Sequence, residues 1–187
     1  MRQTRERAFS FARITVDAAL ARDSEQSADT RPAAESPTVA AEFGHQLYCA
    51  SGAADPEAAP GALPRRGPAP RFARLALPIL ADLAGIADPR LAHHIIKTLD
   101  HLRDTQPGRV LAIAATTVTS TEAYARDHIG LQDVSTLIQH VLAEYRTVIM
   151  SSAEELAAVR TMLSSFVRLG WDSAIELYEQ TNYLKPL

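Results

Sequence analysis

The chain has 187 residues, a length that allows one domain with a sizeable buried core. Its formal net charge is −3. Residues 1–74 carry a net charge of +1, from 10 basic and 9 acidic residues. Residues 75–187 carry a net charge of −4, from 9 basic and 13 acidic residues. Neither part has the strong positive charge that would make nucleic acid or an anionic membrane the main partner.

Cysteine content and hydropathy indicate a cytoplasmic protein. Cys49 is the single cysteine, so an internal disulfide is excluded and a reducing compartment is favoured. No run approaches the roughly 18 apolar residues of a membrane span. The first residues lack the apolar core of a signal peptide. We therefore expect no membrane association.

The first 70 residues show only a weak amphipathic pattern. Residues 5–21 can form a helix, and the Ser/Asp/Glu/Pro-rich stretch 23–36 is typical of a linker. Residues 53–70 contain five prolines and two glycines, which predicts an irregular loop. Between them, residues 37–52 are predicted to form a helix that docks on the remainder. Its expected apolar face consists of Val39, Phe43, Leu47 and Ala50.

From residue 71 onward, apolar residues recur at spacings of three and four, as in amphipathic helices. The first predicted helix covers 71–86, with Pro78 as a kink or a late start. Its expected apolar stripe is Phe72, Leu75, Ile79, Leu83 and Ile86. Asp88 and Pro89 predict an N-cap and a first-turn proline for a helix that ends near Arg103. Residues 109–118 could form a helix or a buried strand; we favour a helix, because no other segment offers a sheet partner.

The remaining pattern predicts an irregular stretch over 119–130 and then three helices. The first covers 131–150, and Ser152 with Glu155 forms a capping box for the second. Gly170 supplies a left-handed stop, and Asp172 caps the last helix. The residues expected in the core include Leu99, Leu137, Leu163 and Phe166.

These elements predict an all-α fold of antiparallel helical hairpins, stacked as a HEAT-like array or an irregular bundle. The predicted divisions are residues 1–36 (helix and linker), 37–52 (docking helix), 53–70 (Pro-rich loop) and 71–187 (helical domain).

Histidines are the first candidates for a site. His93 and His94 are adjacent and should point about 100° apart on a helix. His94 and His101 are two turns apart, too far to share a metal without a ligand from another helix, such as His128 or His140. We expect no metal and no cofactor. One histidine should bond a backbone carbonyl, and the others should be solvated.

Other residues suggest chemistry more weakly. His45 and Cys49 are four residues apart on a helix and could form a nucleophilic pair, although a partly buried, inert cysteine is the favoured interpretation. Glu154 and Glu155 suit the positive end of a helix. Glu122, Asp127 and His128 are expected to lie in a solvated loop. The basic run is expected to be a solvated tether; it consists of Arg65, Arg66, Arg71 and Arg74. Trp171 is expected to anchor the core.

Four stretches together resemble the C-terminal helical region of large bacterial multidomain proteins that carry an ATPase module upstream. They are Gln46-Leu-Tyr-Cys-Ala-Ser-Gly-Ala, Asp88-Pro-Arg-Leu-Ala-His-His-Ile-Ile-Lys-Thr-Leu, Leu142-Ala-Glu-Tyr-Arg and Ser165-Phe-Val-Arg-Leu-Gly-Trp-Asp-Ser-Ala. The resemblance covers roughly residues 40–180 and implies a HEAT-like tail of the kind found in defence or signalling proteins. The Gly-rich phosphate loop of an ATPase is missing from this sequence.

The sequence therefore predicts a module that binds a protein partner and is not an enzyme, either the tail or a truncated or standalone relative of a larger protein. Two alternatives stay open: a small nucleic-acid-binding regulator, which would need a basic helix face, and an enzyme that uses His45 and Cys49 or the central histidines.

Overall fold

The computed structural model describes residues 36–51 and 70–182, and these ranges contain eight helices and no strand. The predicted all-α class is therefore confirmed. The predicted helix 5–21, the linker 23–36 and the loop 53–70 lie outside the described residues, apart from Ser36 and Pro70, which begin helices. The helices are α2 (Ser36–Ser51), α3 (Pro70–Leu83), α4 (Pro89–Leu102), α5 (Pro107–Ser120), α6 (Glu122–Arg126), α7 (His128–Ser151), α8 (Ala153–Val167) and α9 (Asp172–Asn182).

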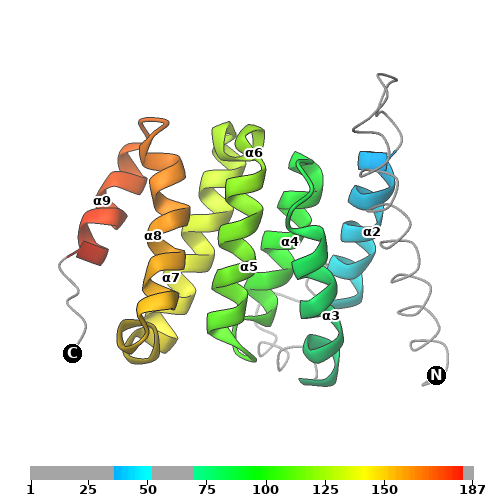
Figure 1. The fold of residues 1–187 in the computed structure, drawn as a ribbon, viewed down its shortest axis with the longest axis horizontal. Coiled ribbons are helices and arrows are strands. Elements are labelled where there is room, and N and C mark those ends of the chain that lie inside the picture. Colours follow the sequence, from blue (N-terminus) through cyan, green and yellow to red (C-terminus); the bar gives the residue numbers. More distant parts are fainter. Residues whose placement is uncertain (1–35, 52–69, 183–187) are drawn as a thin grey trace, which may run out of the picture.

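The helices form two layers (Figure 1). One layer contains α3, α5 and α8, and the other contains α2, α4 and α7. Helices within a layer run parallel to one another, and the two layers run in opposite directions. The short α6 lies across one end between α5 and α7, and α9 packs on α8. This arrangement confirms the expected antiparallel hairpins stacked side by side.

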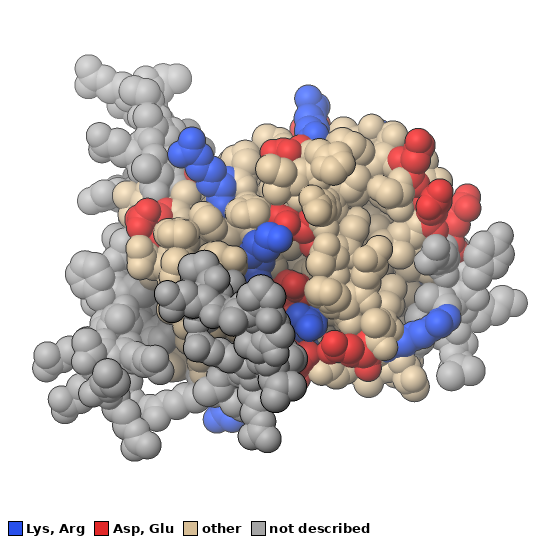
Figure 2. Space-filling model, turned by 180° about the vertical axis from the view of Figure 1, so that it is seen from behind, with Lys and Arg blue, Asp and Glu red and all other residues tan. Residues whose placement is uncertain are grey.

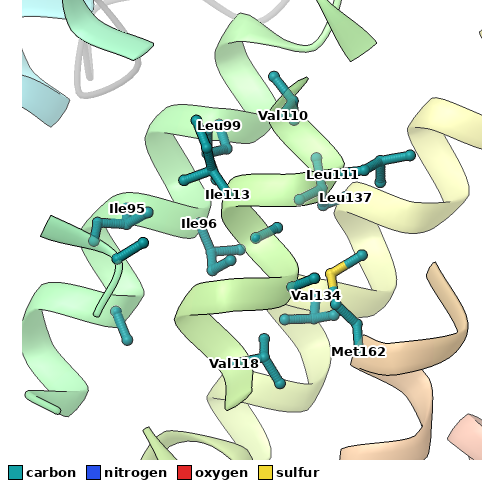
Figure 3. Packing of buried hydrophobic residues seen from close by; sticks show 14 of the residues in the cluster. Ile95, Ile96, Leu99, Val110, Leu111, Ile113, Val118, Val134, Leu137 and Met162 are labelled. Atoms are coloured by element: carbon teal, nitrogen blue, oxygen red, sulfur yellow. The ribbon is translucent and has the colours of Figure 1, made fainter. Parts of the chain in front are cut away.

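The middle helix α5 forms the centre of the core (Figure 3). It contacts α3, α4, α7 and α8, and Arg109 is its only charged residue. Its buried Thr117 hydroxyl donates to the Ile113 carbonyl at 2.9 Å, so this polar group is satisfied within the helix. The choice of helix over strand for residues 109–118 is confirmed. Seven residues of α5 are buried: Val110, Leu111, Ile113, Ala114, Ala115, Thr117 and Val118.

The four residues named as core are confirmed. Leu99, Leu137, Leu163 and Phe166 each have 0% exposure. They come from α4, α7 and α8, so the core joins both layers. Full burial of such a side chain contributes about 1.5–3 kcal/mol relative to leaving it in water.

Helix caps agree with the sequence in part. The Asp88 side chain accepts hydrogen bonds from the amides of Arg90 and Leu91 at 2.8 and 3.1 Å, and Pro89 is the first residue of α4, as predicted. The first amide bonds of α9 run to the carbonyl of Trp171. Asp172 is therefore the first residue of that helix, and its prediction as the cap is wrong.

Only one of the two hydrogen bonds of the predicted capping box of α8 forms. The Ser152 hydroxyl accepts from the Glu155 amide at 3.3 Å, as expected. The Ser152 amide, however, donates to the carbonyl of Ile149, so it has no need of the Glu155 carboxylate. That carboxylate lies instead against Gly108 in the first turn of α5, where a negative charge is favoured because α5 has no side-chain cap.

The prediction of an irregular stretch over 119–130 is wrong. The chain leaves the helical conformation at Thr121 and at Asp127. The Thr121 carbonyl accepts the amides of Tyr124 and Ala125 to start α6. Asp127 then caps α7 by accepting the Ile129 amide at 3.0 Å. Short helices with tertiary contacts lack the long periodicity that sequence patterning detects.

Gly130 lies in the first turn of α7. A Cβ atom at this position would lie 2.1 Å from the carbonyl oxygen of Tyr124. Glycine therefore permits the close approach of α6 to the first turn of α7.

The predicted faces of α2 and α3 are each partly wrong. Val39 is 48% exposed on α2, and Leu75 is 40% exposed on α3, which starts at Pro70 and includes Pro78 in its interior. Phe72 is half-buried. Alanines occupy much of the buried faces instead, because close helix packing favours small side chains over long ones. The residues of these two helices that are buried are Ala40, Ala41, Gly44, Leu47, Ser51, Ala73, Ala76, Leu77, Ile79, Leu80 and Leu83.

Candidate functional site

Helix α4 presents one polar face to α7 and another to α2. His93 and His94 point in different directions, as predicted for adjacent helical residues about 100° apart. His93 meets Asp133 of α7, and His94 meets His45 of α2. The α7 side holds two clusters of charged residues. The α2 side holds imidazole rings.

The first cluster surrounds Asp133 of α7, which is only 5% exposed. Its Oδ2 lies 2.7 Å from His93 Nδ1 and accepts the Tyr124 hydroxyl at 3.2 Å. Its Oδ1 is 2.7 Å from Lys97 Nζ. A buried carboxylate needs such partners, because an unpaired buried charge is strongly unfavourable.

Electrostatics favour the charged form of Asp133 and the neutral form of Tyr124. Burial alone would raise the pKa of Asp133, but hydrogen bonds from His93 and Lys97 outweigh it and hold that pKa below its ordinary value. Burial, together with the nearby Asp133 charge, raises the pKa of Tyr124, so its phenol remains a donor.

The second cluster lies two turns further along both helices. Asp100 Oδ1 is 2.7 Å from His140 Nδ1, and Arg103 donates to the Asp100 carbonyl at 2.7 Å. Arg103 also lies 3.6 Å from Glu144. We call the two clusters together the α4–α7 seam; it comprises His93, Lys97, Asp100, Arg103, Asp104, Asp133, His140, Glu144 and Tyr145.

The seam is open to solvent along its rim. The side chains of Lys97, His140 and Glu144 are 41%, 44% and 47% exposed. Seen from this side, charged groups of both signs follow one another across the middle of the face (Figure 2). The seam is therefore both a structural connection and an accessible polar surface.

The imidazole cluster lies between α2 and α4. The ring centroids of His45 and His94 are 5.0 Å apart, and those of Tyr48 and His94 are 6.0 Å apart. His94 Nδ1 is buried and has no hydrogen-bond partner in the described part of the chain. An open pocket of about 710 Å³ lies beside the rings, lined by Ala41, Glu42, His45, Asp88, Pro89, Arg90 and His94.

Both histidines beneath α2 are kept neutral by their surroundings. Burial lowers the pKa of His94, and the neighbouring His93 and His45 lower it further. Burial also lowers the pKa of His101, whose imidazole hydrogen-bonds the backbone of Ser51 at the end of α2.

His45 and Cys49, the possible nucleophilic pair, are in contact, as their spacing of four residues on one helix allows. Cys49 Sγ lies 3.6 Å from His45 Nε2. Cys49 is exposed, which corrects the expectation of a partly buried thiol. Glu42, which lines the pocket together with His45, accepts a hydrogen bond from Gln46 at 2.8 Å. Within residues 36–51 and 70–182, no three His, Cys, Asp or Glu side chains converge as metal ligands.

The remaining candidates have separate local roles. Glu122 pairs with Arg126, Asp127 caps α7, and the His128 ring meets Trp171 with centroids 5.8 Å apart, so the three do not form one cluster. Trp171 packs half-buried against the core, as expected of an anchor.

The basic run and the acidic pair are described only in part. Arg74 is exposed, whereas Arg65, Arg66 and the Arg71 side chain lie outside the described part. Glu154 and Glu155 are both in the first turn of α8, as predicted.

The α4–α7 seam was missed by the sequence analysis. Its signal was present as a polar stripe at positions 93, 97, 100 and 104, spaced like one face of a helix. The side chains of His93 and His140 are 36% and 44% exposed, so both stay partly solvated, but each also binds a carboxylate of a neighbouring helix, which the sequence did not predict.

Comparisons with protein-family models, curated proteins and solved structures find no match to this chain. The resemblance to helical tails of ATPase-containing proteins therefore stays a prediction. Among the helices described here, none is both long and apolar enough to cross a membrane.

Proposed function

We propose that the chain is a non-catalytic interaction or scaffold module of HEAT-like type, which binds a protein partner in the cytoplasm. We further propose that it is the tail or a relative of a larger multidomain protein. The observation that carries this proposal is the layer of parallel helices α2, α4 and α7, with the half-exposed seam along it.

Two properties of the seam support a binding role. Stacked helical hairpins present the same helix of each unit on one side, and such extended surfaces suit protein partners. The seam also contains Arg103 and Tyr145, residue types that are enriched at protein interfaces. Its mixed charges favour a protein surface with both signs over a polyanion.

The described histidines also support a non-catalytic role. His93 and His140 are each bound to a carboxylate of a neighbouring helix, which fixes their rings in contacts between helices. His94 and His101 lie beneath α2, where burial keeps their rings neutral.

Affinity purification with matched charge reversals tests the proposal. Glu144→Lys changes the rim of the seam, and the control Asp82→Lys changes an exposed position on α3 in the opposite layer. A specific partner should be retained by the unmodified chain and by Asp82→Lys, and lost with Glu144→Lys. Equal retention by both variants would contradict the assignment of the seam.

A further inference from the structure

We propose that α2 is a detachable helix, docked on α4 at neutral pH and released in mild acid through protonation of His94 and His101. The inference does not depend on the proposed function. It concerns how one helix of the parallel layer is held.

The contact between α2 and α4 is close and built from small residues. A Cβ atom on Gly44 would lie 2.6 Å from Leu91 Cδ1 and 3.5 Å from His94 Cβ. On α2, the buried residues beside Gly44 are Ala40, Ala41, Leu47 and Ser51, and Phe43 packs half-buried against the core. α2 packs chiefly on α4 and meets α3 only at its edge. In the described part of the chain α2 is therefore held through one extensive contact with α4, whereas α5 is packed on several sides.

His94 lies in the middle of this contact. From α2 it faces His45, Tyr48 and Glu42, and from α4 it faces His93 and the cap Asp88. The pocket beside it also contains Arg90. Protonated His94 would be a half-buried cation beside two other imidazoles, with its buried Nδ1 lacking a hydrogen-bond acceptor in the described part. The carboxylates of Glu42 and Asp88 oppose this effect but do not outweigh burial.

His101 lies two turns after His94 on α4 and is likewise partly buried beneath α2. Its ring bonds the backbone of Ser51, and its charged neighbours are Arg103, Asp100 and Asp104. Here too burial outweighs the favourable contacts, and the neutral ring is preferred while α2 is docked.

The direction of the pH effect follows from this preference. Burial is the main cause that lowers the pKa of both histidines below the ordinary value, and release of α2 would remove the part of that burial that α2 supplies, so protons favour release. Docking is at full strength above the ordinary histidine pKa of 6.5 and weakens as the pH falls below it. The α4–α7 seam behaves differently, because a protonated His93 or His140 still faces a carboxylate.

Hydrogen exchange of the full chain at about pH 7.5 and about pH 5.5, corrected for intrinsic rates, measures the release. At about pH 5.5, one unit below the free pKa, each histidine can weaken docking by up to about tenfold, so the two together set an upper limit of about a hundredfold. Amides of α2 should therefore exchange between about tenfold and about a hundredfold faster at the lower pH, whereas those of α5 and α8 should change little. Equal α2 exchange at both pH values, or acid loss of protection in α5 and α8 together with α2, would overturn the proposal.

Two variants make the test specific. His94→Gln/His101→Gln keeps a donor at residue 101 but cannot gain charge, so α2 should stay protected in acid; either single variant should remove part of the effect. His128→Gln is the matched control, because His128 is exposed and contacts Trp171 away from α2. A full acid effect in the double variant would contradict the assignment.

Gly44→Leu provides the released state without acid. A leucine there collides with α4, so α2 should exchange at about pH 7.5 as fast as α2 of the unmodified chain does at about pH 5.5. If this substitution also removes protection from α5 and α8, α2 is an inseparable part of the fold and the proposal is wrong.

Discussion

His93 on α4 and Asp133 on α7 are joined at 2.7 Å although 40 residues separate them in the chain. The pairing recurs two turns further along both helices with the residue types exchanged, since Asp100 of α4 meets His140 of α7 at 2.7 Å. Two pairs in the same register show that α4 and α7 run parallel. The seam thus fixes the register of two equivalent helices in successive hairpins.

Removing the Asp133 carboxylate should destabilise the fold. Asp133→Asn loses charge-assisted hydrogen bonds with His93 and Lys97, so we expect a loss of about 1.5–3 kcal/mol in the free energy of unfolding at neutral pH. Asp82→Asn on α3 is exposed and serves as the control, with a change below about 0.5 kcal/mol. Urea denaturation measures both; equal values would show that the buried carboxylate contributes no more than an exposed one.

The same carboxylate predicts a pH dependence. The pKa of Asp133 in the folded chain lies below its ordinary value of 3.8, so its stabilisation is present above that pH and disappears as the pH falls through the lower, folded pKa. Unfolding free energies measured across this acid range should fall more steeply for the unmodified chain than for Asp133→Asn. Parallel curves would mean that Asp133 titrates alike in both states.

Truncation of core leucines should be costly. Leu137→Ala and Leu163→Ala remove fully buried side chains, and each should cost about 2–5 kcal/mol through lost burial and a residual cavity. Leu75→Ala, at a position that is 40% exposed, is the matched control and should cost much less. Thermal or urea unfolding of the three variants checks the order, and a loss below about 0.5 kcal/mol at both core positions would refute the packing.

Two glycines should respond in opposite ways to alanine. At Gly130 a Cβ would meet the Tyr124 carbonyl, so Gly130→Ala should cost about 1–3 kcal/mol by forcing α6 away from α7. At Gly85 a Cβ meets nothing within 4 Å, and Gly85→Ala should be neutral or slightly stabilising. Differential scanning calorimetry of the pair measures this contrast, and a similar melting temperature for both variants would contradict the close approach at Gly130.

Local signals in the sequence predict local structure. The spacing around Leu137 and Leu163 identifies their helices, and Asp88 with Pro89 marks a helix start, because these patterns depend only on neighbours within two turns. The face of α2 was predicted incorrectly because Gly44 and the nearby alanines give no hydrophobic signal, although they allow a close contact with α4.

The site depends on contacts between helices and could not be predicted in this way. The partner of His93 lies on another helix, and the spacing of residues near His93 contains no information about Asp133. The contact of His45 with Cys49 could be predicted, since both lie on one helix four residues apart.

Site-specific photo-cross-linking tests the central claim, that this chain binds a protein through the α4–α7 seam. A photoreactive side chain is placed at residue 144 on the seam rim or, as the control, at residue 82 on α3, and each chain is irradiated in the cells that produce it. We predict one defined protein adduct from residue 144 and none of that mass from residue 82. Adducts from residue 82 alone, or from neither position, would contradict the account.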